Sequence, residues 1–256
     1  MKNLPEHLHP FVLALRKGLI ETFNESLLGA YIHGSLTYGG YVRERSDVDI
    51  LAICKSAIDD ETKSHLSEMI CSLSDGFPHE AKNTELDVLF LKDIQGRSEN
   101  LSSLVTYAGG VLATSQKLDG YWIELTNTRN SGIPLCGALP SSIIPKTDAG
   151  VLIRANKDKF SSLQNNAENW ERINLWNQTY ILVQACRVLY SLNNKLGLVS
   201  KQEALAWAGD NVPDQFAEML RVARAKLDTV EGPREKIISE NWRDFFAYIE
   251  SKFAET

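Results

Sequence analysis

The stretch His33–Leu51, HGSLTYGGYVRERSDVDIL, holds a Gly-Ser pair and, after a spacer of eleven residues, an Asp-x-Asp pair. Gly34 lets phosphate oxygens approach main-chain N–H groups, and the hydroxyl of Ser35 adds a further donor. Asp47 and Asp49 lie two residues apart on an expected strand, so both carboxylates project from one face. The stretch therefore predicts an anion cradle beside a carboxylate pair, which suits Mg²⁺ carrying a nucleoside triphosphate.

The sequence around this stretch predicts a sheet with helices. Phe11–Phe23 repeats apolar residues every four positions, which is typical of an amphipathic helix. Leu27–His33 and Val48–Cys54 are apolar runs with the composition of buried strands. Glu61–Leu73 has a helical stripe, and Thr84–Leu91 returns to strand composition. The predicted order is helix, strand, strand, helix, strand.

The third expected strand supplies two further acids. Glu85 and Asp87 alternate onto one of its faces. We expect Asp87 to serve as the general base, because the buried run Val88–Leu91 follows it, whereas Glu85 lies nearer the exposed strand start. The base would take the proton of an attacking hydroxyl while metal ions stabilise charge on the phosphoryl group. Glu85 stays open as the alternative.

The chain of 256 residues is long enough for two domains. From Asp148 onward the pattern is almost wholly helical, so we place a boundary around Pro145. We predict an α+β protein with a mixed sheet in residues 1–145 and a bundle of about four or five helices in residues 146–256. The helices are expected to break at Gly197, Gly209, Pro213 and Gly232–Pro233.

Composition narrows the partners and the location of the protein. No stretch is long and apolar enough to cross a bilayer, and the first ten residues do not resemble a signal peptide. The four cysteines lie far apart, with no Cys-x-x-Cys pair, which favours reduced thiols in a cytoplasmic protein. A net charge of -6 disfavours extended nucleic acid and suits a cationic small molecule. We expect a monomer with no membrane contact.

The order Gly-Ser, spacer, Asp-x-Asp and later strand acid resembles the nucleotidyltransferase superfamily related to DNA polymerase beta. Over nearly the full chain, the sequence is more closely similar to the aminoglycoside adenylyltransferases, which modify streptomycin at its 3''-hydroxyl or spectinomycin at its 9-hydroxyl. The helical half contributes NQTYILVQACRVLYS at 177–191 and LVSKQEALAWA at 198–208. These segments resemble that family's helix with an inward arginine and its lysine-containing helix start.

The resemblance implies an enzyme that transfers AMP from ATP to a hydroxyl of spectinomycin, streptomycin or both, releasing pyrophosphate and conferring resistance. It implies that Asp47 and Asp49 hold two Mg²⁺ ions and that Ser35, beside Gly34, binds phosphate. Asp87 takes the place of the family's glutamate base and is shorter. Two alternatives stay open: nucleotide transfer to a protein or RNA acceptor, and a catalytically silent nucleotide-binding module.

The resemblance also implies that the helical domain closes over nucleotide and substrate, with Arg187 and Lys201 contacting the phosphates. Lys201 stands at an expected helix N-terminus, which suits an anion. Without the resemblance, both would be ordinary surface cations. Trp170, Glu171 and Trp176 are candidates for substrate binding, with core packing and a solvated face as the alternatives. Their spacing does not match that of streptomycin-modifying members, so the drug and its hydroxyl stay open.

Overall fold

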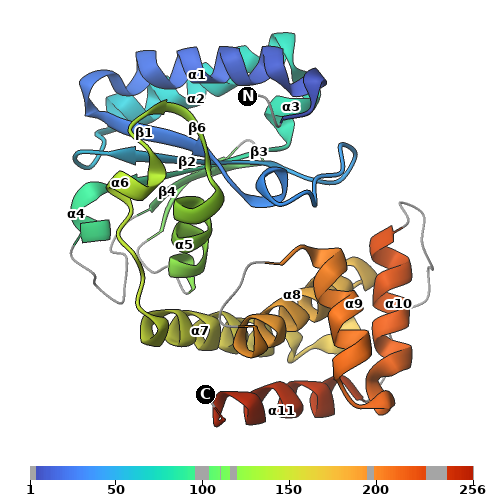
Figure 1. Cartoon of the computed structure of the whole chain (residues 1–256). Helices are drawn as coiled ribbons and strands as arrows, with labels where there is room; N and C mark the ends of the chain where they lie inside the picture. The colour runs from blue at the N-terminus through green and yellow to red at the C-terminus, as the bar shows by residue number, and fades with distance from the viewer. Residues whose placement is uncertain are drawn as a thin grey trace. The chain divides into compact units, whose positions relative to one another are not determined.

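The computed structural model describes residues 4–95, 104–109, 111–115, 120–194, 199–228 and 241–255. The chain divides into two compact units, Met1–Thr147 and Asp148–Thr256 (Figure 1). The described part of the first unit combines a sheet with helices, whereas that of the second is helical. The α+β fold class expected from the sequence is confirmed. Within the described ranges, no helix is long and apolar enough to cross a membrane.

A mixed sheet lies at the centre of the first unit. In the described residues it has six strands in the order β5-β4-β3-β2-β1-β6. The parallel pair is β2 and β3, and the other neighbours are antiparallel. The strands are β1 Leu27–Ile32, β2 Val48–Cys54, β3 Thr84–Phe90, β4 Leu104–Ala108, β5 Val111–Ser115 and β6 Ile133–Gly137. The first three strands match the sequence prediction closely.

Two long helices cover one face of the sheet (Figure 1). They are α1, His9–Phe23, and α2, Asp60–Gly76, which provides the crossover that parallel strands require. Their apolar stripes pack on the side chains of β2 that alternate onto that face, and the buried set is Phe11, Leu15, Leu19, Phe23, Leu66, Ile70, Val48, Ile50, Ala52 and Cys54. Because side chains alternate along a strand, Asp49 projects from the opposite face.

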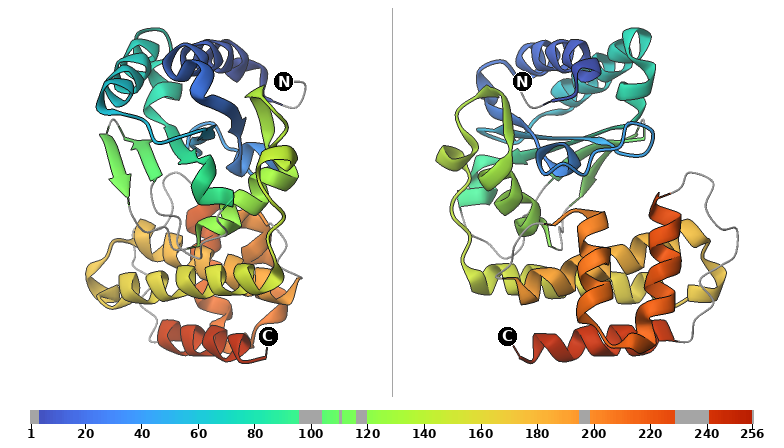
Figure 2. Two further views of the ribbon diagram at one scale, coloured as in Figure 1. Left: turned by 90° about the vertical axis from the view of Figure 1, so that its left-hand side faces the viewer. Right: turned by 45° about the vertical axis from the view of Figure 1, so that its right-hand side comes forward.

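The described residues between Lys92 and Pro145 form strands and helices that were not predicted from the sequence. The hairpin β4–β5 extends one edge of the sheet (Figure 2), and helix α5, Tyr121–Ser131, lies on the face opposite to α1 and α2 (Figure 1). The edge strand leaves Val111 64% exposed, and α5 buries the polar Asn127 and Thr128, so neither shows a clear apolar period. The short helices are α3 Pro78–Lys82, α4 Leu91–Gln95 and α6 Pro140–Ile143.

The second unit packs around helix α8, Leu175–Asn193, most of whose side chains are buried. Its described α-helices are α7 Ala149–Ala167, α8 Leu175–Asn193, α9 Lys201–Asn211, α10 Ala217–Asp228 and α11 Asn241–Phe253. The number agrees with the prediction, and Pro213 lies at the expected break. Gly209 does not: it lies inside α9, so the prediction of a break there was wrong. A single glycine weakens a helix by about 1 kcal/mol and need not end it. Gly197 and Gly232–Pro233 fall outside the described residues.

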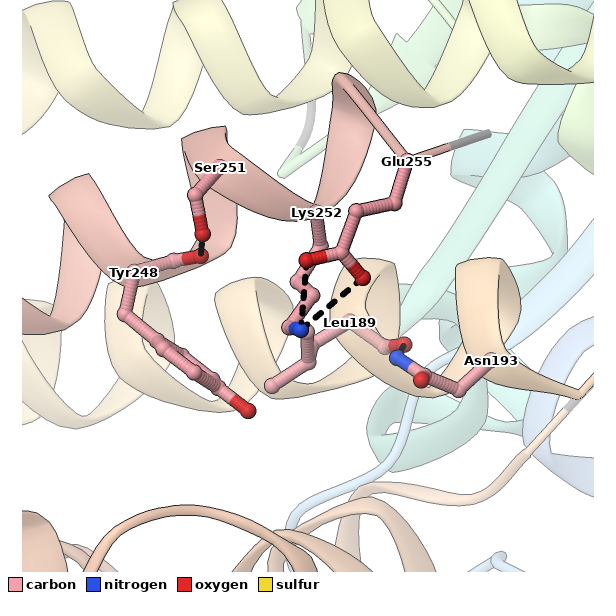
Figure 3. A network of polar contacts seen from close by, with 6 residues as sticks. All are labelled: Leu189, Asn193, Tyr248, Ser251, Lys252 and Glu255. Atoms are coloured by element: carbon pink, nitrogen blue, oxygen red, sulfur yellow. Dashed lines mark hydrogen bonds and ion pairs between the residues drawn. The ribbon is translucent and has the colours of Figure 1, made fainter.

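Polar contacts finish the ends of two helices in this unit (Figure 3). On α11, the Ser251 hydroxyl donates to the Tyr248 carbonyl oxygen at 2.7 Å, and Lys252 Nζ contacts Glu255 Oε1 at 2.8 Å. On α8, the side-chain amide of Asn193 donates to a carbonyl one turn earlier, at 2.8 Å. Each contact joins residues three or four positions apart, so the contacts stabilise the helix ends locally.

Candidate active site

The Gly-Ser pair begins a short turn, Gly34–Thr37, directly after β1. Gly34 has a φ of +64°, a conformation that favours glycine. A Cβ at this position would lie 1.9 Å from Oδ2 of Asp49, so the missing side chain makes room for that carboxylate. The N–H of His33 donates to the carbonyl oxygen of Asp49 at 2.9 Å, and the Thr37 hydroxyl donates to the carbonyl of Gly34 at 2.8 Å. The loop and the acid are therefore held together.

The carboxylate pair lies where β2 begins. The strand starts at Val48, so Asp47 precedes it, which corrects the expectation that both acids lie on the strand. Asp47 is exposed, and Asp49 is half-buried, as is Ser35. Among the described residues, no group of three or more His, Cys, Asp or Glu side chains is arranged as a metal site. A carboxylate pair still fits Mg²⁺, which takes one or two carboxylates together with substrate phosphates.

Asp87 lies on the same face of the sheet and accepts a hydrogen bond on each carboxylate oxygen. The hydroxyl of Thr106 donates to Oδ1 at 2.7 Å, and the hydroxyl of Tyr121 donates to Oδ2 at 2.6 Å. In the parallel pair, Asp49 lies opposite Glu85, and Asp87 lies two residues further along β3. Glu85 is exposed, whereas Asp87 is half-buried. Asp87 is therefore the more firmly oriented of the two candidate bases.

Three acidic side chains act electrostatically on the Tyr121 hydroxyl. Burial raises the pKa of Tyr121 well above its usual value, and the negative charges of Asp87, Glu124 and Asp49 raise it further. The phenol therefore stays protonated and donates its hydrogen bond. Burial also lowers the pKa of His33, opposed by Glu124 and Asp87, and its Nδ1 has no hydrogen-bond partner among the described residues. The region is a partly buried, acidic end of the sheet.

Three residues of this region were missed by the sequence analysis. No role was predicted for Tyr121, Thr106 or Glu124. Thr106 meets Asp87 because β4 pairs with β3, and a single sequence does not reveal which strands pair. The sequence offers one local indication of the helix start, Gly120. In the structure this glycine has a φ of +77° and turns the chain into α5 just before Tyr121.

The helical unit brings the two predicted phosphate-binding cations close to one loop. Arg187, on α8, donates from Nε to the carbonyl oxygen of Val199 at 3.1 Å. Lys201 follows shortly after as the first residue of α9, behind a capping box built on Ser200, so the predicted helix start is confirmed. Its Nζ lies 6.0 Å from the centroid of the Tyr180 ring. Both cations therefore belong to the region around the start of α9.

The structure separates the three substrate-binding candidates. Trp170 is 3% exposed and stacks on Trp242 with ring centroids 5.4 Å apart, so it is a core side chain. This placement corrects its assignment to substrate binding, because its ring has no open face for a ligand. Glu171 is exposed in the short turn Trp170–Arg172. Trp176 is 46% exposed near the start of α8, one turn before Tyr180, which is 47% exposed.

Comparisons with known proteins find a matching family, similar chains and a similar fold. Residues 151–251 match the family described as aminoglycoside adenylyltransferase, C-terminal domain. The spectinomycin 9-adenylyltransferases of Staphylococcus aureus strains Mu50 and N315 are each 24% identical over 223 residues, covering 80% of this chain and 79% of the relative. A solved spectinomycin adenyltransferase from Enterococcus faecialis, with ATP and spectinomycin, has a TM-score of 0.74 at 16% identity, covering 96% of this chain and 99% of that chain. The predicted resemblance to aminoglycoside adenylyltransferases is confirmed, and the last match shows the shared fold.

Proposed function

We propose that this chain, which resembles the aminoglycoside adenylyltransferases along both of its units, transfers AMP from ATP to a hydroxyl of spectinomycin and so confers resistance. One observation carries the proposal: the Asp49 carboxylate fills the space that the missing side chain of Gly34 leaves open. This closeness supports the proposal, because nucleotidyl transfer needs a metal-binding carboxylate beside the loop that binds the phosphates. The named relatives support spectinomycin as the first acceptor to test.

Asp47 and Asp49 are the residues proposed to hold two Mg²⁺ ions together with the phosphates of ATP. When bound, the metal ions neutralise charge on the triphosphate and on the phosphoryl group under attack. Gly34 and Ser35 bind phosphate oxygens through main-chain N–H groups and a hydroxyl. The half-buried position of Asp49 supports this role, because partial exclusion of water strengthens its attraction for a cation.

In the proposed reaction, the acceptor hydroxyl attacks the α-phosphorus of ATP. A bond forms between the acceptor oxygen and the α-phosphorus, and the bond from the α-phosphorus to the oxygen bridging to the β-phosphate breaks. Pyrophosphate leaves with that bridging oxygen, and the hydroxyl proton passes to the carboxylate of Asp87. Asp87 is preferred to Glu85 for this step because two hydroxyls orient it, whereas Glu85 lies exposed.

The helical unit is proposed to contribute to nucleotide and acceptor binding. Arg187 and Lys201 contact the phosphates, and their closeness to the loop before α9 supports a common role. Glu171 and Trp176 are proposed to contact the acceptor, the first through its negative charge and the second through its exposed ring. A cationic aminocyclitol offers both an ammonium group and an apolar ring face to such residues.

Growth of a drug-sensitive bacterium that expresses the chain tests the proposed function. We expect the minimal inhibitory concentration of spectinomycin to rise with the wild-type chain and to return to the host's value with Asp49→Asn at equal expression. Streptomycin on parallel plates decides whether the second drug is also an acceptor, and kanamycin serves as the unrelated control. Sensitivity to spectinomycin that is unchanged by the wild-type chain would contradict the proposal.

A further inference from the structure

The carboxylate of Asp87 is held by two hydroxyl groups that have no chemical step in the proposed reaction. Thr106 donates to Oδ1 at 2.7 Å from 19 residues along the chain, and Tyr121 donates to Oδ2 at 2.6 Å from 34 residues along. Hydrogen bonds from a hydroxyl to a carboxylate at these lengths are among the stronger ones in proteins. The orientation of Asp87 is therefore set by two other elements of the unit.

The sheet register fixes the first donor. Thr106 lies directly opposite Asp87 in the antiparallel pair β3–β4, so the two side chains share a face and the short threonine reaches the carboxylate. Slipping the register by one residue would turn the buried neighbours of both residues out of the core. Those neighbours are Leu86, Val88, Val105 and Tyr107.

Helix α5 fixes the second donor. Tyr121 is its first residue and follows Gly120, whose φ of +77° allows the sharp turn into the helix. Trp122 is 5% exposed and Leu125 is fully buried, so their packing anchors the same end of α5. Burial keeps the Tyr121 phenol protonated, so it acts toward Asp87 as a donor. The phenol is thus held rigidly by the core of the unit.

Each carboxylate oxygen can accept more than one hydrogen bond, so Asp87 keeps free lone pairs when Thr106 and Tyr121 donate to it. The two donors fix the directions in which these lone pairs point. We propose that Tyr121 and Thr106 are positioning residues, which hold the Asp87 carboxylate in the orientation from which it accepts the proton of the acceptor hydroxyl. The inference rests on the proposed function, in which Asp87 is the base. Without the donors, the terminal torsion of an aspartate is broad, and misplacing a group by about 1 Å costs on the order of 10²-fold in rate.

Steady-state kinetics of AMP transfer to spectinomycin by the full chain test the inference. Tyr121→Phe and Thr106→Val each remove one donor while keeping most of the side-chain volume. We expect each to lower kcat by about 10- to 100-fold, with KM for ATP and for spectinomycin within about two-fold of wild type. Thr106→Ser keeps the hydroxyl and should restore most of kcat. If Tyr121→Phe fails to fold, the Val and Ser variants at position 106 carry the test.

A matched control comes from another buried tyrosine. The Tyr31 hydroxyl donates to the carbonyl oxygen of Ala138 at 2.9 Å, so Tyr31→Phe removes a similar hydrogen bond without touching Asp87, and kcat should not change. In an Asp87→Asn background, Tyr121→Phe should alter the residual rate by less than about two-fold, because both residues act through one carboxylate. A merely structural role would produce the same loss in both backgrounds.

The kinetic results distinguish failure of the positioning role from failure of the proposed function. If Tyr121→Phe keeps the wild-type kcat, or loses activity only through KM or through a lower melting temperature, the inference is overturned and the proposed function stands. If the wild-type chain transfers AMP to no acceptor, the proposed function fails and the inference fails with it. A fall in kcat that requires Asp87 and is rescued by Thr106→Ser supports both.

Discussion

The carboxylate of Asp49 occupies the space where a side chain at position 34 would lie. L side chains rarely adopt a φ of +64°, and a Cβ added at Gly34 would overlap the Asp49 carboxylate unless that side chain moved. Alanine at position 34 would therefore have to displace the proposed metal ligand, the phosphate-binding turn, or both. The absence of a side chain at position 34 therefore matters to the site as much as the acids around it.

Gly34→Ala tests this contact, with Gly39→Ala as its control in the same loop. Gly39 also has a positive φ, +77°, but a Cβ there would meet nothing within 4 Å. Both variants should lose about 1–2 kcal/mol of unfolding free energy through backbone strain. Only Gly34→Ala should also lose AMP transfer, by about 100-fold or more. Urea unfolding and kinetics measure the two effects, and equal activity of both variants would disprove the role given to Gly34.

The choice between the two acids of β3 is a second question at this scale. Asp87→Asn keeps the shape of the side chain and removes the base, so kcat should fall by about 10²- to 10⁴-fold. Glu85→Gln, at an exposed position, should change kcat by less than about three-fold. The kinetic assay uses saturating ATP and spectinomycin. The assignment would be reversed if the Glu85 variant were the inactive one.

Elements with strong periodicity were predictable from the sequence, and elements at the edge of the sheet were not. The strand Val48–Cys54 was predicted to the residue, because a buried strand with branched side chains leaves a continuous apolar run. The hairpin β4–β5 and helix α5 were missed, because half-exposed elements with buried polar groups carry no clear period. Gly34 and Asp49 follow from motif spacing, whereas Thr106 and Tyr121 depend on pairing and packing that only the fold supplies.

The start of α9 shows how a local contact responds to pH. The hydrogen bonds from Ser200 lower the pKa of Glu203 from its usual value, so the ionised carboxylate stabilises the folded chain. This contribution is fully present above about pH 4.5 and is lost as the pH falls through the lowered pKa. Because Glu203 is exposed and solvent screens its charge, Glu203→Ala should cost at most about 1 kcal/mol at pH 7 and much less at pH 3. Unfolding curves at both pH values measure this, and a pH-independent cost would refute it.

The described residues form a separate hydrophobic core in each of the two units. The core of the first unit ends at Leu135, and that of the second begins at Phe160, so the two share no residue. Since a domain with its own core can fold alone, residues 148–256 should do so. Circular dichroism should show a helical spectrum with a cooperative thermal transition and a near-ultraviolet signal from the stacked Trp170 and Trp242. A fragment with an unfolded spectrum would contradict the independence of the two units.

Pyrophosphate release by purified protein with ATP and Mg²⁺ tests whether the chain adenylylates spectinomycin through Asp49. The reaction is measured with spectinomycin, streptomycin, kanamycin and no acceptor, and Asp49→Asn serves as the matched inactive chain. We predict release that depends on spectinomycin and falls by at least about 10²-fold in the variant. Silence with every acceptor would contradict adenylylation of these drugs and favour a protein or RNA acceptor, or a silent nucleotide-binding module. Release that Asp49→Asn leaves unchanged would contradict the site itself.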